Sequence, residues 1–185
     1  MFFSIKLVYL ISYTFVLLLV GGDNAPMVND SPPNAKYIAR FKPHAINGDY
    51  HVRGFISFQT SPRGFVQVHL DVDGLPTSGG PFPYHVHQYP VPTDGNCTGT
   101  GGHLDPYHGS ATSPGDPAGL QVGDLAGRHG DIPVGVYAFE TYYFDPFISL
   151  NPSDPAFIGG LSVVIHLDNL TRIACANITV GCDDH

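Results

Sequence analysis

Short runs of alternating apolar and polar residues recur along the chain, separated by turn-forming residues. Residues 53–58 (RGFISF) and 65–70 (FVQVHL) show this period of two, which places alternate side chains on opposite faces of a β-strand. Comparable runs lie at residues 37–41, 84–89, 135–139, 161–167 and 173–180. No segment has convincing helical periodicity. The pattern predicts seven or eight strands in an all-β fold, an antiparallel immunoglobulin-like sandwich or Greek-key β-barrel without a major helix.

Two longer connections interrupt this series, at residues 90–131 and 141–160, and both are rich in turn-forming residues. Loops of this length often carry function. The whole chain has 22 Gly and 17 Pro among 185 residues, which fits many turns between short strands and disfavours a helical bundle. No internal repeat and no second-domain boundary is visible. We therefore expect one domain, at residues 35–182.

The N-terminal segment has the pattern of a secretory signal peptide. Lys6 is followed by fourteen mostly apolar residues that end before Gly21 and Gly22. This run is shorter than the roughly 20 residues that span a bilayer. We place the signal peptide at residues 1–22, expect no membrane span after its cleavage, and interpret residues 23–34 as a flexible leader.

Cysteines and glycosylation motifs agree with secretion. Three Asn-X-Thr triplets begin at Asn96, Asn169 and Asn177 and are candidate glycosylation sites. Cysteines stand at positions 97, 175 and 182. In an oxidising compartment two of the three are expected to pair, which leaves one for a partner or a small thiol.

The charge balance excludes one class of function. Sixteen acidic residues against eight basic ones give a net charge of −8 with histidine neutral. The chain therefore lacks the broad positive surface that binding to nucleic-acid phosphates requires.

Histidines are the strongest chemical signal. His85 and His87 lie two apart in a predicted strand, so their imidazoles share one face. Such a pair alone would also fit two solvent-facing histidines. However, His103 follows in a glycine-rich turn, and His166 ends the apolar run 161–165. Four neutral imidazoles suit Cu(II) and tolerate Cu(I), which permits one-electron redox cycling.

Several motifs, in order along residues 35–180, resemble the copper/zinc superoxide dismutase family. They are His85-Val86-His87, Gly102-His103 after Cys97, Val122-Gly123-Asp124-Leu125, Val163-Val164-Ile165-His166 and Thr171-Arg172-Ile173-Ala174-Cys175. The resemblance implies an eight-stranded Greek-key barrel, one copper ion held by His85, His87, His103 and His166, and a disulfide between Cys97 and Cys175. It also implies that His103 releases the copper and takes up a proton during turnover.

Arg172 has a role implied by the resemblance and a separate physical rationale. The family places this residue beside the copper. Superoxide is an anion, so a guanidinium at the site is needed to attract and orient it on a negatively charged protein.

The sequence departs from the copper/zinc enzymes at the zinc site. Asp124 fits the aspartate ligand, but Gln121 stands where one zinc-binding histidine is expected, and Ala111 stands where the other is expected. A neutral amide is a poor zinc ligand compared with imidazole. His108 or His129 would have to be recruited by a rearranged loop. Zinc binding at the usual place is therefore doubtful.

A second departure lies before Arg172. Only residues 167–171 separate it from His166, where the copper/zinc enzymes have a much longer charged loop. Both departures resemble the secreted copper-only branch known from fungi and oomycetes, in which a carboxylate can stand at the position of Gln121. We expect Asp124 to take over as the partner that fixes the distal ring nitrogen of His103.

The sequence thus predicts an extracellular or cell-wall-associated superoxide dismutase, a monomer with superoxide as its substrate. Two alternatives remain open at this point. One is a secreted domain that binds copper or zinc without turnover. The other is an interaction module that uses the aromatic segment 142–147 as a contact patch.

Overall fold

The strands of this protein form one antiparallel sheet. The computed structural model describes residues 24–110, 112 and 115–181, and within them the sheet has seven strands in the order β4-β6-β7-β1-β2-β3-β5. The strands are β1 (Lys36–Phe41), β2 (Arg53–Thr60), β3 (Val66–Asp73), β4 (Tyr84–His87), β5 (Ala138–Asp145), β6 (Ser162–His166) and β7 (Arg172–Val180). The predicted all-β class is confirmed, with seven strands in place of the eight of the Greek-key barrel.

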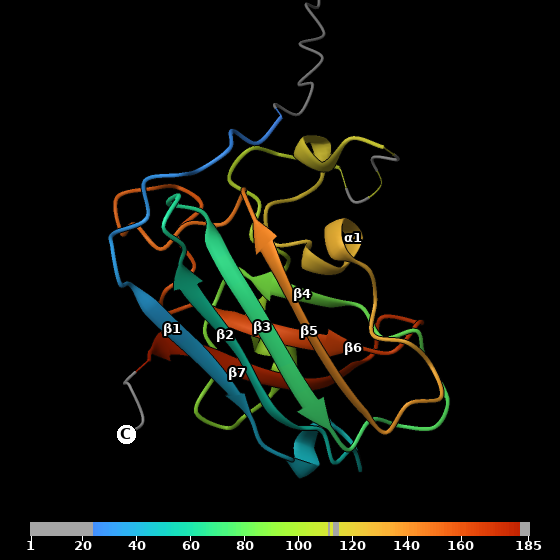
Figure 1. The fold of residues 1–185 in the computed structure, drawn as a ribbon. Helices are drawn as coiled ribbons and strands as arrows, with labels where there is room; N and C mark the ends of the chain where they lie inside the picture. Colours follow the sequence, from blue (N-terminus) through green and yellow to red (C-terminus); the bar gives the residue numbers. More distant parts are fainter. Residues whose placement is uncertain (1–23, 111, 113–114, 182–185) are drawn as a thin grey trace, which may run out of the picture.

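The sheet curls so that its two halves face each other. Figure 1 shows β1, β2, β3 and β5 side by side in one layer, with β4, β6 and β7 crossing behind them. Strand β3 alternates buried and solvent-facing residues along its whole length, so one face packs on the core. Strand β6 is buried at every position. The core between the layers includes the fully buried Phe58, Leu70 and Ile165.

Helical structure is limited to short turns in the described residues. They are α1 (Leu125–His129) and the 3₁₀ turns η1 (Ala45–Asn47), η2 (Cys97–Thr100) and η3 (Pro117–Gly119). Among the residues that the structure describes, no helix has the length and hydrophobicity of a membrane span.

Strand β5 corrects the predicted boundaries. A strand was expected at residues 135–139 with a loop from 141, whereas β5 continues to Asp145 because it pairs with β3 from Val66 to Asp73. Tyr142 and Phe144 therefore lie on the outer face of a strand and are exposed. The segment proposed as an aromatic contact loop is largely a strand with its side chains divided between two faces.

The leader also differs from expectation. Ala25 and Val28 are only 5% exposed, and their backbone N–H groups donate to Ala118 O at 2.8 Å and Pro146 O at 2.7 Å. The Ser31 hydroxyl accepts from Leu150 N at 3.1 Å. Two apolar side chains thus anchor a segment that its polar composition marked as loose. The expected signal peptide (residues 1–22) and Cys182 lie outside the described residues.

Candidate metal centre

Four histidines that are far apart in the sequence meet at one end of the second layer. His85 and His87 share a face of β4, which pairs with β6, the strand that ends at His166. His103 forms a β-bridge with His87. One ring nitrogen from each histidine lies within 4.8 Å of the others. The four residues therefore converge on a single point.

Backbone carbonyls fix the orientation of two of these rings. His87 Nδ1 lies 2.9 Å from Gly101 O, and His166 Nδ1 lies 3.1 Å from Leu170 O. A carbonyl oxygen can only accept, so each Nδ1 carries the proton and each Nε2 keeps its lone pair. The two Nε2 atoms lie 3.3 Å apart. Both lone pairs are therefore available to one metal ion.

The other two rings contribute different nitrogens. His103 Nδ1 lies 2.7 Å from Gln121 Oε1, which leaves its Nε2 as the free nitrogen. His85 Nδ1 is buried without a hydrogen-bond partner, and its Nε2 lies 3.5 Å from Asp124 Oδ1. A buried polar atom without a partner is costly, and a metal ion would satisfy it. The donor set therefore fits a metal ion bound by four neutral imidazoles.

The partner of His103 is Gln121, and the expectation that Asp124 would hold this ring is wrong. Asp124 Oδ1 instead accepts a hydrogen bond from Gly127 N at 2.8 Å at the start of α1, and faces His85. Gln121 Nε2 donates to Asp105 Oδ2 at 3.4 Å, which turns Oε1 toward His103. An amide thus fixes the tautomer that a carboxylate was expected to fix.

Burial keeps the imidazoles neutral. Loss of hydration, together with the neighbouring histidines, lowers the pKa of His85 to about 2. Burial also lowers the pKa of His87 to about 3 and that of His166 to about 4, against the carbonyl hydrogen bonds that raise both. The pKa of His103 is lowered by burial in the same way. Unprotonated rings are the form that binds metal.

The metal-free protein should therefore lose stability in mild acid. His85, His87 and His166 have folded pKa values below the unfolded value of 6.5, so their contribution is complete above pH 6.5. It is lost progressively as pH falls through the folded pKa values of about 4 for His166, about 3 for His87 and about 2 for His85. Each should cost up to about 1.4 kcal/mol per pH unit. Urea denaturation between pH 7 and 4.5 measures this slope. A constant free energy of unfolding across that window would contradict the burial of neutral rings.

Arg172 is held beside the histidines by the η2 turn. Its Nη1 donates to Cys97 O at 2.7 Å, Thr98 O at 3.0 Å and Thr100 Oγ1 at 3.0 Å. Its Nη2 donates to Gly101 O at 2.6 Å, the same carbonyl that His87 Nδ1 contacts. The guanidinium charge also lowers the pKa of His87, although burial and the neighbouring His103 lower it more. Arg172 is therefore positioned by the same loop that orients a metal-site histidine.

A disulfide ties this loop to the sheet. Cys97, at the start of η2, is bonded to Cys175 of β7 with an S–S distance of 2.10 Å. A shallow pocket opens next to Arg172. It is lined by Ile46, Asn47, Asn96, Thr98, Leu170, Thr171 and Arg172. This pocket provides an approach from solvent to the guanidinium.

A buried ion network behind the centre is not apparent from the sequence. Asp145 is fully buried; its Oδ2 lies 2.8 Å from Arg128 Nε and 2.9 Å from His129 Nε2. Arg128 also donates to Gln121 O at 2.9 Å and Val122 O at 2.5 Å. The network thus holds the loop that carries Gln121. Its only sequence signal is the charged pair Arg128-His129 following the Asp124 motif.

The other candidate residues lie apart from the four histidines. His129 is engaged with Asp145, and His108 is exposed in a turn with a φ of 57°. Asn169 and Asn177 are exposed and Asn96 is half-buried. Asn96 lines the pocket next to Arg172.

Comparisons with known proteins identify the family. A model of the copper/zinc superoxide dismutase family matches residues 52–178. The Candida albicans protein named cell surface superoxide dismutase [Cu-Zn] 4 is 46% identical over 171 residues, covering 92% of this chain and 71% of that protein. Cell surface Cu-only superoxide dismutase 5 of the same organism is 42% identical over 177 residues, covering 96% and 75%.

A solved structure supports the same assignment. The Cu(II) form of Candida albicans superoxide dismutase 5 superposes with a TM-score of 0.75 at 43% sequence identity, covering 82% of this chain and 95% of that chain. The family match spans more than half of the sequence and includes all four converging histidines. This chain therefore belongs to the copper/zinc superoxide dismutase family.

Proposed function

We propose that the chain is an extracellular, copper-dependent superoxide dismutase that binds one copper ion through His85, His87, His103 and His166. The observation that carries the ligand assignment is that the two nitrogens of each ring have different surroundings. Three rings have one nitrogen engaged by a protein oxygen at 3.1 Å or less and the other free, and the fourth has a buried Nδ1 without a partner. Such partners orient ligand histidines and fix their tautomers.

Copper bound at this point supplies the one-electron exchange that converts two superoxide anions and two protons to dioxygen and hydrogen peroxide. The chain contributes the attraction of the anion. Arg172 is half-buried and lines the pocket, and its four hydrogen bonds hold its guanidinium in place. A guanidinium with a fixed orientation concentrates and docks a small anion better than a mobile ammonium would.

Proton handling is assigned to His103. Its Nδ1 donates to Gln121 Oε1, so its Nε2 is the atom that can take up a proton. The Gln121 amide cannot act as an acid, and the proton therefore comes from solvent. A carboxylate at the position of Gln121 could share a proton with the His103 ring, and the amide of Gln121 cannot.

Metal analysis combined with an activity assay tests the assignment. Protein purified from secreted material should contain about one copper per chain and dismutate superoxide, as expected for four imidazole ligands. Zinc without turnover would indicate a binding domain and would overturn the proposal.

Substitutions of Arg172 test whether its charge or the position of its guanidinium determines the rate of dismutation. Arg172→Gln should lower kcat/KM by about tenfold and weaken its decrease with ionic strength, because steering of an anion is lost and salt screens it. Arg172→Lys should retain part of both effects. The matched control is Arg53→Gln, which removes an exposed cation paired with Asp73 at 2.9 Å. Equal losses in Arg172→Gln and Arg53→Gln would show that only net charge matters.

Maturation and assembly complete the proposal. We place signal cleavage after residue 22, glycosylation at Asn96, Asn169 and Asn177, and a monomer in solution. Mass spectrometry before and after glycosidase treatment, with N-terminal sequencing, measures the first two. Sedimentation measures the third, and a dimer would contradict it.

A further inference from the structure

A second group of metal-binding side chains lies on the outer face of the sheet, on strands that contribute none of the four converging histidines. His69 and Asp71 lie two apart on β3, so they point to the same side. Glu140 of β5 pairs directly with Asp71. One ligand atom from each of the three residues lies within 4.8 Å of the others. The sheet register alone therefore brings a nitrogen and two carboxylates together.

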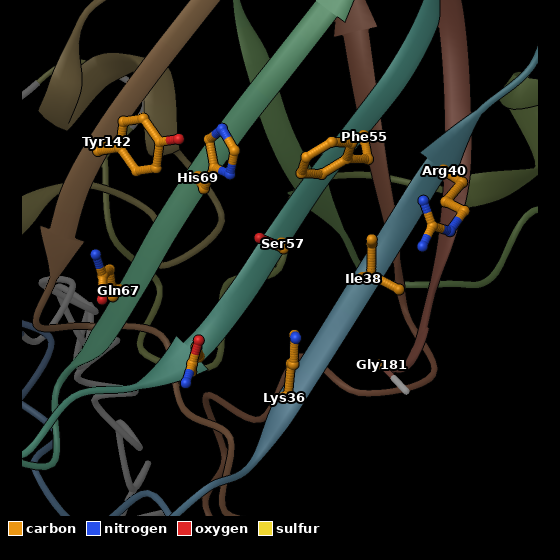
Figure 2. A pocket seen from close by; sticks show the side chains of 10 residues that line it. Lys36, Ile38, Arg40, Phe55, Ser57, Gln67, His69, Tyr142 and Gly181 are labelled. Atoms are coloured by element: carbon orange, nitrogen blue, oxygen red, sulfur yellow. The ribbon is translucent and has the colours of Figure 1, made fainter. Parts of the chain in front are cut away.

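Aromatic neighbours hold the imidazole of this group in place. His69 stacks on Tyr142 with ring centroids 3.9 Å apart and an angle of 13°, and the Phe55 ring is perpendicular to His69 with centroids 5.0 Å apart. Figure 2 shows the three rings together on β2, β3 and β5. His69 Nε2 lies 2.9 Å from Glu140 Oε1. An oriented ring loses little side-chain entropy when it binds a ligand.

The two carboxylates form an unfavourable pair in the absence of a cation. Like charges directly opposite each other on neighbouring strands destabilise a sheet. The Tyr142 hydroxyl donates to Glu140 Oε1 at 2.9 Å, and this hydrogen bond, followed by that of His69, lowers the pKa of Glu140. Glu140 is therefore ionised at neutral pH, and its carboxylate lies directly opposite that of Asp71 on the neighbouring strand.

We propose that His69, Asp71 and Glu140 form a second metal site, for Zn²⁺, on the outer face of β3 and β5. One imidazole and two carboxylates supply three of the four ligands that zinc takes in proteins, and water supplies the fourth. An imidazole ligand disfavours Ca²⁺ and Mg²⁺, which prefer oxygen donors. On binding, the proton of His69 resides on Nδ1, so that Nε2 offers its lone pair in place of its present hydrogen bond to Glu140.

The bound ion would link the edge strand β5 to its neighbour β3. Strand β5 is the last strand on its side and has β3 as its only sheet neighbour among the described residues. A ligand that binds only the folded protein stabilises it in proportion to the logarithm of its concentration. Zn²⁺ at this site should therefore raise the melting temperature without entering the copper chemistry.

Calorimetric titration of the copper-loaded enzyme with Zn²⁺ tests this proposal. We expect one Zn²⁺ bound per chain, no copper released, and unchanged dismutase activity. Asp71→Asn and Glu140→Gln should each weaken Zn²⁺ binding at least tenfold and abolish the Zn²⁺-dependent rise in melting temperature. The matched control is Asp73→Asn, which removes the same charge from the same face of β3 but at a residue paired with Arg53.

Three outcomes would overturn the proposal. The first is the absence of Zn²⁺ binding to the copper-loaded enzyme. The second is equal weakening in Asp71→Asn and Asp73→Asn, which would indicate general attraction to surface charge. The third is Zn²⁺ uptake matched by copper release, which would place the zinc among the four histidines.

Discussion

His87→Ala should abolish superoxide dismutation and prevent stable retention of copper. His87 is 1% exposed, and its Nε2 lies 3.3 Å from His166 Nε2, at the point where the four rings converge. Loss of a partner behind a ligand typically costs about 10–100-fold in metal affinity or activity, and loss of the ligand itself should exceed this. Copper content after dialysis and the rate of superoxide decay measure the two effects.

Two further variants make this a graded series. Gln121→Leu removes the acceptor at 2.7 Å from His103 Nδ1 while keeping every ligand, and should lower activity by about 10–100-fold. His51→Ala removes a histidine whose side chain is 68% exposed and should change neither copper content nor rate. Full activity in His87→Ala would refute the ligand assignment. Equal activity in Gln121→Leu and the unmodified enzyme would show that the amide does not tune the ring.

One loop contacts both a proposed copper ligand and the residue proposed to dock the anion. Gly101 O contacts both His87 Nδ1 and Arg172 Nη2, and Thr100 Oγ1 contacts His87 Nδ1 at 3.2 Å and Arg172 Nη1 at 3.0 Å. The backbone at Gly101 has a φ of 74°, and an added Cβ would lie 2.6 Å from Tyr89 Cδ2. Glycine is therefore required where the loop turns to reach both groups.

Local patterns in the sequence were sufficient to predict most strands and to place two of the four converging histidines side by side. Alternation located β2 and β3, and it also placed His85 and His87 on one face of β4. Both inferences use only neighbouring residues. The convergence of His103 and His166 depends on strand pairing between β4 and β6 and on a bridge across a loop. For these two residues the family resemblance was needed.

The predictions that were wrong also concern features that depend on contacts between residues far apart in the sequence. Composition marked residues 23–34 as loose, but Ala25 and Val28 find apolar surface on distant loops. Asp124 is the stronger acceptor by residue type, yet capping α1 turns it away from His103 and leaves that place to Gln121. Asp is a preferred N-cap residue and Gln is not, so the position of Asp124 directly before Leu125 was the available signal.

Asp145→Asn should destabilise the fold by about 3–5 kcal/mol, because it leaves the nearly fully buried Arg128 without a counter-charge. Asp145 accepts hydrogen bonds from Phe147 N at 2.8 Å and Ile148 N at 3.0 Å in addition to its two side-chain partners. Full burial raises its pKa, but the hydrogen bond from His129 and the Arg128 charge outweigh this and lower the pKa to about 2. Its contribution is present above the unfolded pKa near 3.8 and is lost as pH falls toward 2. Guanidinium denaturation at pH 7 measures the loss.

Most of this loss is the cost of leaving Arg128 buried without a partner, and less of it is the net stabilisation by the ion pair. A double-mutant cycle separates these two contributions to the free energy of unfolding. Arg128→Met should be destabilising alone, whereas Arg128→Met combined with Asp145→Leu should cost less than the sum of the single changes, because neither charge is left buried alone. Asp49→Asn, at a fully exposed carboxylate, is the control and should shift stability by less than about 0.5 kcal/mol. Strict additivity of the two core substitutions would contradict direct coupling. Since Arg128 also holds Gln121 O and Val122 O, the Arg128 variants should lower dismutase activity even where the fold survives.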